Sequence, residues 1–171
     1  MNIDNITFRT YNEADLPALH EIYSYYIANT TVTYAISPIT PEQMREIVEP
    51  VSPRYKTFVI LYDGEICGYA LFTRFKPREA FDISAEVTIY LKQGFGGKGI
   101  GGIALELLEN EAKLANLHVL VALVASTNLN SHKLFLKNGY TKCADFKEVA
   151  KKFNQIIDLV CFQKIIDQES R

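Results

Sequence analysis

Six of the nine glycines in this chain stand within residues 94–102. This segment follows a strand-like run at 85–91 and leads into apolar residues at 100, 103, 104, 107 and 108, the spacing of one helix face. A glycine-dense turn between a strand and a helix lets backbone N–H groups converge on an anion at the positive end of the helix dipole. The segment therefore predicts a phosphate or pyrophosphate site, and a flexible turn is the alternative.

Three phosphate-binding designs use a loop of this kind, and the neighbouring residues separate them. In a P-loop, Gly-Lys is followed by Ser or Thr, whereas here Lys98 is followed by Gly99. Gly97, Gly99 and Gly102 formally satisfy the G-x-G-x-x-G pattern of dinucleotide-binding folds. That pattern also needs an acidic residue at the end of the next strand, and the apolar run 117–124 leads into Ala-Ser-Thr-Asn instead. The remaining design is the pyrophosphate cradle of coenzyme A-dependent acyltransferases.

Glu86 is the acidic residue best placed for chemistry beside this loop. It lies at the start of the run that enters the glycine-rich segment, and strand alternation puts Glu86, Thr88 and Tyr90 on one face. An acid on a largely apolar central strand is costly unless its carboxylate faces water or a cavity. Acetyl transfer from a thioester to an amine needs the amine deprotonated. Glu86 is therefore a candidate general base, with a solvated or paired carboxylate as the alternative.

The elements that must position these residues read as interspersed strands and helices. The pattern predicts strands at 6–9, 58–62, 66–72, 85–91, 117–124 and 156–163, of which the last closes the sheet. Helices are expected after Asp15, after a capping box at 40–43, from residue 100, and from Ser131 with Asn130 as its cap. The expected fold class is therefore α/β (α+β), a mixed central sheet with helices on both faces.

Length, charge and cysteine spacing limit the functions open to the chain. Its 171 residues suit one domain at 1–166 with a frayed tail at 167–171. A net charge of −2 without a Lys/Arg-rich block argues against nucleic acid and anionic membranes, and no apolar run approaches the ~20 residues of a membrane span. Cys67, Cys143 and Cys161 fit neither a disulfide framework nor a zinc site. We interpret them as reduced core thiols, expect no metal, and expect a cytoplasmic protein because no signal peptide is evident.

Further motifs stand in order along the chain, at 13–19, 29–34, 75–81, 86–91, 97–102, 128–140 and 148–160. They include Phe75-Lys76-Pro77-Arg78-Glu79-Ala80-Phe81, Glu86-Val87-Thr88-Ile89-Tyr90-Leu91, and Asn128-x-x-Ser131-x-x-Leu134 followed by Gly139-Tyr140. In this order they resemble the GNAT N-acetyltransferase superfamily, and within it the branch of phosphinothricin and methionine sulfoximine or sulfone acetyltransferases. The resemblance covers almost the whole chain. It implies a mostly antiparallel sheet flanked by helices, acetyl-CoA as co-substrate, a small amino-acid-like amine as acceptor, and a homodimer.

The resemblance also implies roles for individual residues. Glu86 matches the family's catalytic base. The residues implied to bind acetyl-CoA are Ile89, Tyr90 and Leu91 through their backbone, Gly97, Lys98, Gly99, Ile100, Gly101 and Gly102 in the loop, and Asn128 and Lys137 beyond it. The residues implied to contact the acceptor are Tyr34, Lys76, Arg78, Glu79, Ala80 and Phe81, of which the two cations would meet a carboxylate, phosphinate or sulfoximine group. A solvated surface position is the alternative for each lysine and arginine, and a plain helix cap is the alternative for Asn128.

Two positions depart from the family pattern. Gly96 stands where the superfamily loop usually begins with Arg or Gln, so one side-chain contact to phosphate is missing. Phe135 stands where relatives often carry His or Tyr, which would protonate the leaving thiolate. A thiol with a pKa of about 8.5 is a tolerable leaving group without an acid, so this loss affects the acid's identity more than catalysis. His132, one turn away, is expected to be a surface residue.

Three functions remain open from the residues and the resemblance together. The leading one is acetyl transfer to the amine of a small amino-acid-like substrate. A rival enzyme would acetylate a protein N-terminus or another amine, and a rival of another class is a non-catalytic acyl-CoA-binding module. The presence of Glu86 and of the acceptor segment at 75–81 favours an enzyme. Release of free thiol from acetyl-CoA in the presence of amino acids and their analogues would separate the classes.

Overall fold

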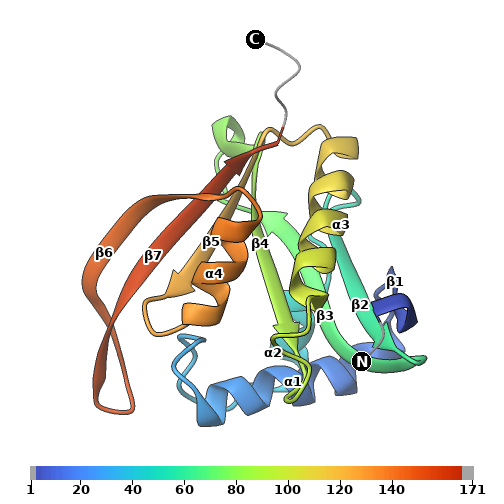
Figure 1. Ribbon diagram of the computed structural model, residues 1–171, viewed down its shortest axis with the longest axis horizontal. Coiled ribbons are helices and arrows are strands. Elements are labelled where there is room, and N and C mark those ends of the chain that lie inside the picture. Colours follow the sequence, from blue (N-terminus) through green and yellow to red (C-terminus); the bar gives the residue numbers. More distant parts are fainter. Residues whose placement is uncertain (1–2, 167–171) are drawn as a thin grey trace.

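The computed structural model describes residues 3–166, whose strands form one seven-stranded sheet (Figure 1). The tail expected at 167–171 lies outside the described residues. The strands lie in the spatial order β1-β2-β3-β4-β5-β7-β6. Their bounds are β1 (Ile6–Thr10), β2 (Lys56–Tyr62), β3 (Glu65–Arg74), β4 (Ser84–Leu91), β5 (Val119–Ala125), β6 (Thr141–Lys152) and β7 (Gln155–Ile165). All neighbouring pairs are antiparallel except β4 and β5, which are parallel, so the expected mixed and mostly antiparallel sheet is confirmed.

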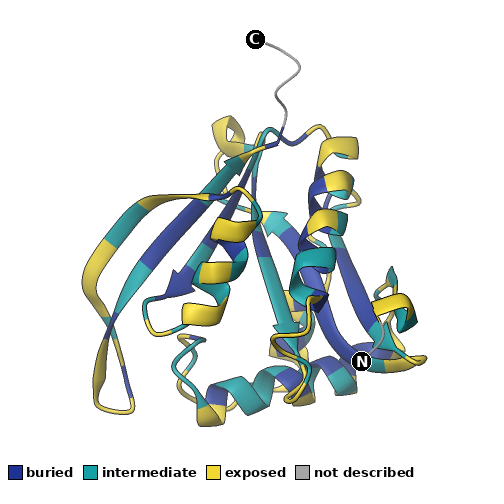
Figure 2. Ribbon diagram, in the orientation of Figure 1, coloured by how far each residue is buried: buried dark blue, intermediate teal, exposed yellow. Residues whose placement is uncertain are grey.

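Four α-helices in the described part of the chain cover the two faces of the sheet. They are α1 (Leu16–Asn29), α2 (Pro41–Val48), α3 (Ile100–Leu114) and α4 (Leu129–Lys137). Helices α1 and α2 bury apolar residues against Tyr69 and Leu71 of β3. Helices α3 and α4 pack on the opposite face. Their apolar residues form a separate hydrophobic cluster there with Ala70 and Phe72 of β3. Because successive strand residues point to opposite faces, the central strands serve both layers and are buried along much of their length (Figure 2).

The helix starts follow the expected capping chemistry with two exceptions. Asp15 precedes α1 as expected, but its side chain makes no capping hydrogen bond to this helix. Thr40 forms a capping box with Gln43, and Pro41 is the first residue of α2. The cap expected at Asn130 is wrong, because α4 begins at residue 129 and Asn128 is its N-cap. The side-chain oxygen of Asn128 accepts the N–H of Ser131 at 3.2 Å. No helix in the described range is long and apolar enough to cross a membrane.

The C-terminal hairpin differs from expectation in two respects. Strand β7 does not close the sheet, because it lies between β5 and β6, which leaves β6 at the edge. Two register shifts interrupt the pairing of β6 with β7, so β6 lacks a regular two-residue alternation. Cys143 lies on this edge strand and is exposed, so its interpretation as a core thiol is wrong, whereas Cys67 and Cys161 are buried.

Candidate active site

Strands β4 and β5 run side by side for only part of their length. Register pairs join them at Ser84, Ala85 and Glu86 of β4, and the described pairing stops there. Strand β4 nevertheless pairs with β3 as far as Leu91, and β5 pairs with β7 as far as Ala125. The facing edges of residues 87–91 and 122–125 are therefore not paired with each other. We call this region the β4–β5 gap.

Hydrogen bonds at the two ends of β4 show which residues turn their main chain toward this gap. Lys92 donates its N–H to the carbonyl of Cys67, in β3, at 2.7 Å. At the other end, Ile83 accepts the N–H of Val119, in β5, at 3.1 Å. Main-chain groups alternate in direction along a strand. Odd-numbered residues of β4 therefore face β5, and even-numbered residues face β3.

This alternation divides the three backbone positions that were expected to bind acetyl-CoA. Ile89 and Leu91 turn their N–H and C=O groups toward the β4–β5 gap, whereas Tyr90 turns its main chain toward β3. The Leu91 carbonyl already accepts the Tyr26 hydroxyl at 2.7 Å. The N–H and C=O groups of Ile89 and the N–H of Leu91 are therefore the main-chain groups of β4 that remain available on the gap side.

The glycine-rich loop joins the C-terminal end of β4 to α3, as expected (Figure 1). Gly97 and Gly99 have φ values of 75° and 86°, in the left-handed region that favours glycine, and Gly99 is the N-cap of α3. The N–H groups of Gly102 and Ile103 both donate to the Gly99 carbonyl. The N–H groups of residues 96–101 donate to no other group of the described chain, and a β-carbon at Gly96 or Gly97 would meet nothing within 4 Å. The loop thus presents a run of free donors at a helix N-terminus.

Gly101 has a packing role that sequence reasoning missed. A β-carbon at this position would lie 3.2 Å from the Leu134 side chain of α4. The glycine therefore lets α3 and α4 approach closely, in addition to its place in the loop. The spacing of glycines alone carried no signal for this contact, because residues 101 and 134 are far apart in the chain. Lys98 is exposed, and its Nζ lies 5.6 Å from the Phe95 ring centroid.

Glu86 lies at the position where the β4–β5 pairing ends, opposite Val121 of β5 and Thr73 of β3. Its side chain is half-buried, and its carboxylate forms no hydrogen bond or ion pair with the described residues. Burial raises the pKa of Glu86 above its ordinary value, and the positive charge of Lys76 opposes that rise. A carboxylate with a raised pKa and no partner is a stronger proton acceptor than a solvated one.

The side chains of Lys76, Cys161 and Tyr34 are linked to Glu86 or to each other by electrostatic interactions. Burial, then Cys143 and Glu86, raises the pKa of the Cys161 thiol, and Lys76 lowers it. Burial, with smaller contributions from Cys161 and Asp158, raises the pKa of Tyr34 to about 12. Lys76 and Tyr34 were expected at the acceptor site; Lys76 acts electrostatically on Glu86 and Cys161, and the Tyr34 hydroxyl donates to the Asp158 carbonyl of β7, the strand that contains Cys161. Sequence reasoning missed Cys161, since a cysteine in an apolar strand gives no sign of what lies across the sheet.

The rest of the expected acceptor segment forms an exposed turn at the N-terminal end of β4. Residues Glu79–Phe81 form a 3-10 helix, and the Phe81 ring contacts Phe75 with a centroid distance of 6.1 Å. Arg78, Glu79, Ala80 and Phe81 are exposed. This turn and the glycine-rich loop lie at opposite ends of β4 (Figure 1). Lys76 is the cation of the segment that affects the pKa of Glu86.

Comparison with known proteins identifies this arrangement. A family model described as Acetyltransferase (GNAT) domain matches residues 8–161. The chain belongs to the GNAT acetyltransferase family. It is similar to phosphinothricin N-acetyltransferase of Streptomyces coelicolor, at 30% identity over 156 residues that cover 89% of this chain and 91% of that protein. The resemblance to this family drawn from the motifs is confirmed, and the chain is an acetyl-CoA-dependent N-acetyltransferase.

Two solved GNAT structures are close to it in fold. The phosphinothricin acetyltransferase of Sinorhizobium meliloti, in complex with acetyl-CoA, has a TM-score of 0.91 at 25% identity, covering 97% of this chain and 91% of that one. The ribosomal-protein-alanine N-acetyltransferase of Brucella melitensis has a TM-score of 0.85 at 32% identity, covering 93% of this chain and 99% of that one. These two enzymes are named for different acceptors, a protein and a small molecule, so a shared fold is compatible with either class.

The two remaining residues expected at the acetyl-CoA site of this GNAT domain lie on or beside α4. Asn128 uses its side-chain oxygen to cap α4, which was the alternative interpretation of this residue, and its amide nitrogen has no partner among the described residues. Lys137 is exposed in the last turn of α4. Asn128 therefore retains donors for a ligand while its oxygen is occupied.

The GNAT position that often carries His or Tyr is part of the core here. Phe135 is 5% exposed and packs against Phe162 and Tyr140, with ring centroids 6.0 and 5.1 Å away. His132 is half-buried, contrary to the expectation of a surface residue. Its Nε2 lies 3.1 Å from the Ala125 carbonyl, and its ring packs edge-on against Phe162.

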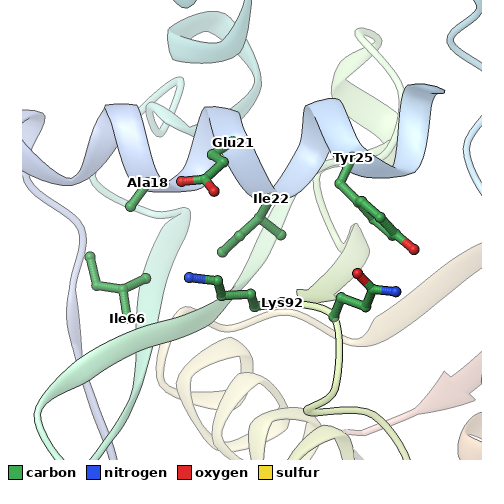
Figure 3. A pocket seen from close by; sticks show the side chains of 7 residues that line it. Ala18, Glu21, Ile22, Tyr25, Ile66 and Lys92 are labelled. Atoms are coloured by element: carbon green, nitrogen blue, oxygen red, sulfur yellow. The ribbon is translucent and has the colours of Figure 1, made fainter. Parts of the chain in front are cut away.

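A pocket of about 140 Å³ lies outside the site built from Glu86 and the gap (Figure 3). One side of α1 lines it with Ala18, Glu21, Ile22 and Tyr25, and Ile66, Lys92 and Gln93 complete it. None of the expected catalytic, cofactor or acceptor residues lines this pocket. Within residues 3–166, no group of three or more His, Cys, Asp or Glu side chains is arranged to hold a metal ion.

Proposed function

We propose that this GNAT enzyme acetylates the amine of a small amino-acid-like acceptor, with Glu86 as the general base. Phosphinothricin, methionine sulfoximine, methionine sulfone and similar amino acids are the proposed acceptors. The observation that carries the proposal is the half-buried, unpartnered carboxylate of Glu86 at the end of the β4–β5 pairing. A buried carboxylate without a partner is costly to the fold, so a catalytic reason accounts for its presence.

The residues around the gap fit the binding of acetyl-CoA. The N–H groups of residues 96–101 supply donors for a pyrophosphate, and the gap side of Ile89 supplies main-chain groups for the amides of a pantetheine arm. The free amide nitrogen of Asn128 and the ammonium groups of Lys98 and Lys137 would add donors nearby. When bound, acetyl-CoA supplies an acetyl group activated as a thioester.

The side chains of the protein then handle the proton and the acceptor. An amine acceptor is largely protonated at neutral pH, so a carboxylate oxygen of Glu86 takes its proton, directly or through one water. The raised pKa of Glu86 makes that transfer less unfavourable. Lys76, whose charge already acts on Glu86, would meet the carboxylate or phosphinate of the acceptor. Tyr34, Arg78, Glu79, Ala80 and Phe81 complete the proposed acceptor set.

A protein N-terminus or another amine is the competing acceptor, and similarity to the Brucella melitensis enzyme supports it. A non-catalytic acyl-CoA-binding module is the competing function, but it gives no reason for the buried carboxylate of Glu86. Thiol release from acetyl-CoA with a panel of phosphinothricin, methionine sulfoximine, methionine sulfone, free amino acids and an Ala-initiated peptide tests all three. We expect release with the small amino acids. Release with the peptide alone contradicts the proposed acceptor class, and release with no acceptor contradicts the proposed activity.

We further propose a homodimer in the cytoplasm. Four apolar side chains of the β6–β7 hairpin are more than half exposed: Phe146, Val149, Phe153 and Ile156. An apolar face on an edge hairpin is suited to a second copy of the same surface. Sedimentation velocity at micromolar concentration should show a dimer that Ile156→Lys dissociates. A wild-type chain that sediments only as a monomer contradicts the proposal.

A further inference from the structure

Lys152 is a lysine in an unusual environment for this residue type. Its side chain lies at the end of β6, next to the hairpin turn, and is 3% exposed. Its Nζ donates to the Thr33 carbonyl at 3.0 Å and lies 5.2 Å from the Phe153 ring centroid. No carboxylate of residues 3–166 pairs with it. An ammonium group without a counter-ion is seldom retained in a protein interior unless its position serves another purpose.

The hydrogen-bond partner of Lys152 is Thr33, which lies in the loop between α1 and α2. Thr33 is itself buried, and its hydroxyl lies 2.9 Å from the Tyr23 hydroxyl of α1. Its carbonyl is the group that accepts from Lys152. Thr33 is therefore held by helix α1 and by Tyr90 of strand β4 through its side chain, and by strand β6 through its main chain.

Two weaker contacts join the flanking residues to the same region. The hydroxyl of Thr31 lies 2.8 Å from that of Thr127, just after β5. The hydroxyl of Tyr34 donates to the Asp158 carbonyl of β7 at 3.2 Å. Both of these contacts are exposed, whereas the Lys152 bond is buried. A buried, charge-assisted hydrogen bond is the stronger of the two kinds.

We propose that Lys152 is a positioning residue of the acceptor site, whose ammonium fixes residues 31–34 in place through the Thr33 carbonyl. The proposal rests on the proposed function in one respect, the role of Tyr34 beside the acceptor. Tyr34 follows Thr33 directly, and its hydroxyl donates to the Asp158 carbonyl of β7. Tyr23, the hydroxyl partner of Thr33, packs edge-on against Tyr90 with ring centroids 5.2 Å apart, and Tyr90 lies on the same face of β4 as Glu86. Holding the Thr33 carbonyl therefore sets where the Tyr34 ring stands relative to the proposed base. The class of acceptor that this serves is the small amine proposed above, bound between the loop and β4.

The effects of a Lys152→Met substitution on stability and on activity distinguish a positioning role from simple packing. Lys152→Met keeps a long unbranched side chain but removes the charge and the donor. A packed methionine removes the cost of a buried ammonium but leaves the Thr33 carbonyl without its donor, so the two effects oppose each other and the melting temperature should change little. A merely structural lysine would instead lose stability on substitution. Lys151→Met is the matched control, because Lys151 is its exposed neighbour on the same strand.

The experiment measures loop order independently of activity. Hydrogen exchange by mass spectrometry on the full chain should show the amides of residues 31–34 exchanging at least tenfold faster in Lys152→Met than in wild type or Lys151→Met. The kcat/KM for the acceptor should fall at least tenfold, while the Kd for acetyl-CoA stays within twofold. Lys152→Arg, which keeps a charged donor, should restore most of the acceptor kcat/KM.

Several results would overturn the proposal. They are unchanged exchange in the loop, faster exchange with unchanged acceptor kcat/KM, or a Lys152→Met chain that does not fold or melts at a much lower temperature. If the wild-type chain acetylates no acceptor, the proposed function fails, and the exchange rates still decide whether Lys152 holds the loop.

Discussion

Glu86 and Val121 form the last register pair between the parallel strands β4 and β5. Up to this pair the two strands share hydrogen bonds, and beyond it each presents its facing edge to the gap. Glu86 therefore lies where the pairing between β4 and β5 ends and the unpaired main chain of β4 begins. A ligand arm that lies along the open part of β4 would bring its end toward this residue. The relationship links the proposed base to the proposed cofactor channel through backbone pairing alone.

The first prediction concerns the activity of a Glu86→Gln variant. The amide keeps the shape of the side chain but does not accept the proton, so kcat/KM should fall by about 10²–10⁴-fold. Acetyl-CoA affinity, measured by calorimetry, should be unchanged. Raising the pH should partly restore the variant, because more of the amine then arrives neutral. Activity near that of wild type across the pH range would show that the base lies elsewhere.

The second prediction concerns stability and follows from the raised pKa of Glu86. Because burial disfavours the charged carboxylate, folding is penalised at pH values above the folded-state pKa and is not penalised below the ordinary value of about 4.3. Glu86→Gln should therefore raise the melting temperature at pH 7 and lose that advantage as the pH falls toward 4. Calorimetric scans of both proteins across this range provide the measurement. A variant less stable than wild type at pH 7 would mean that the carboxylate is held by favourable contacts.

A third prediction addresses the glycine-rich loop through Gly99, the left-handed N-cap of α3. Gly99→Ala should disturb the loop backbone, since a left-handed non-glycine residue costs about 1–2 kcal/mol. Acetyl-CoA binding should weaken at least tenfold, which corresponds to about 1.4 kcal/mol. Gly94→Ala is the matched control, because Gly94 has a similar φ of 87° but precedes the proposed phosphate donors. Equal affinities in the two variants would remove the loop from the binding site.

The fourth prediction is a gain of affinity at Gly96. This residue does not have a positive φ, and a side chain there would meet nothing within 4 Å, so a substitution is tolerated by the fold. Gly96→Arg introduces a cation beside the proposed pyrophosphate donors and should tighten acetyl-CoA binding several-fold, with the gain shrinking as salt is raised. Gly96→Glu should weaken binding by a similar factor. If both variants bind like wild type, position 96 is remote from the phosphates.

Most of the secondary structure and the identity of the family could be predicted from the sequence, because local signals were strong. The capping box at Thr40 and the glycine-rich loop each act over a few residues, and so does the Asp63-Gly64 pair, which forms the turn between β2 and β3. The helix cap at Asn128 was misplaced at Asn130 because both asparagines precede a helical pattern. The position of β7 within the sheet, between β5 and β6, depends on long-range pairing, for which the apolar run at 156–163 holds no information.

The parts of the site that sequence reasoning missed are contacts between distant segments. Cys161 lies within electrostatic reach of Glu86 only because β7 is an inner strand beside β5. Lys152 is one of four lysines in a largely polar strand, and nothing nearby in the sequence indicates that its ammonium is buried against Thr33. Gly101 reads as part of a glycine run, although its lack of a side chain also makes room for Leu134. In each case the partner residue is more than thirty residues away in the sequence, so no local pattern could indicate the contact.

The open edge of β4 consists of peptide groups, which every amino acid carries. Replacing the side chain of Ile89 therefore leaves unchanged what this edge presents to a ligand, provided that the strand keeps its register. The groups whose chemistry depends on residue type, Glu86, Lys76 and Tyr34, belong to the other half of the site. A substitution at Lys76 or Tyr34 is therefore expected to change which acceptor is used, while the peptide groups proposed to hold the cofactor stay as they are.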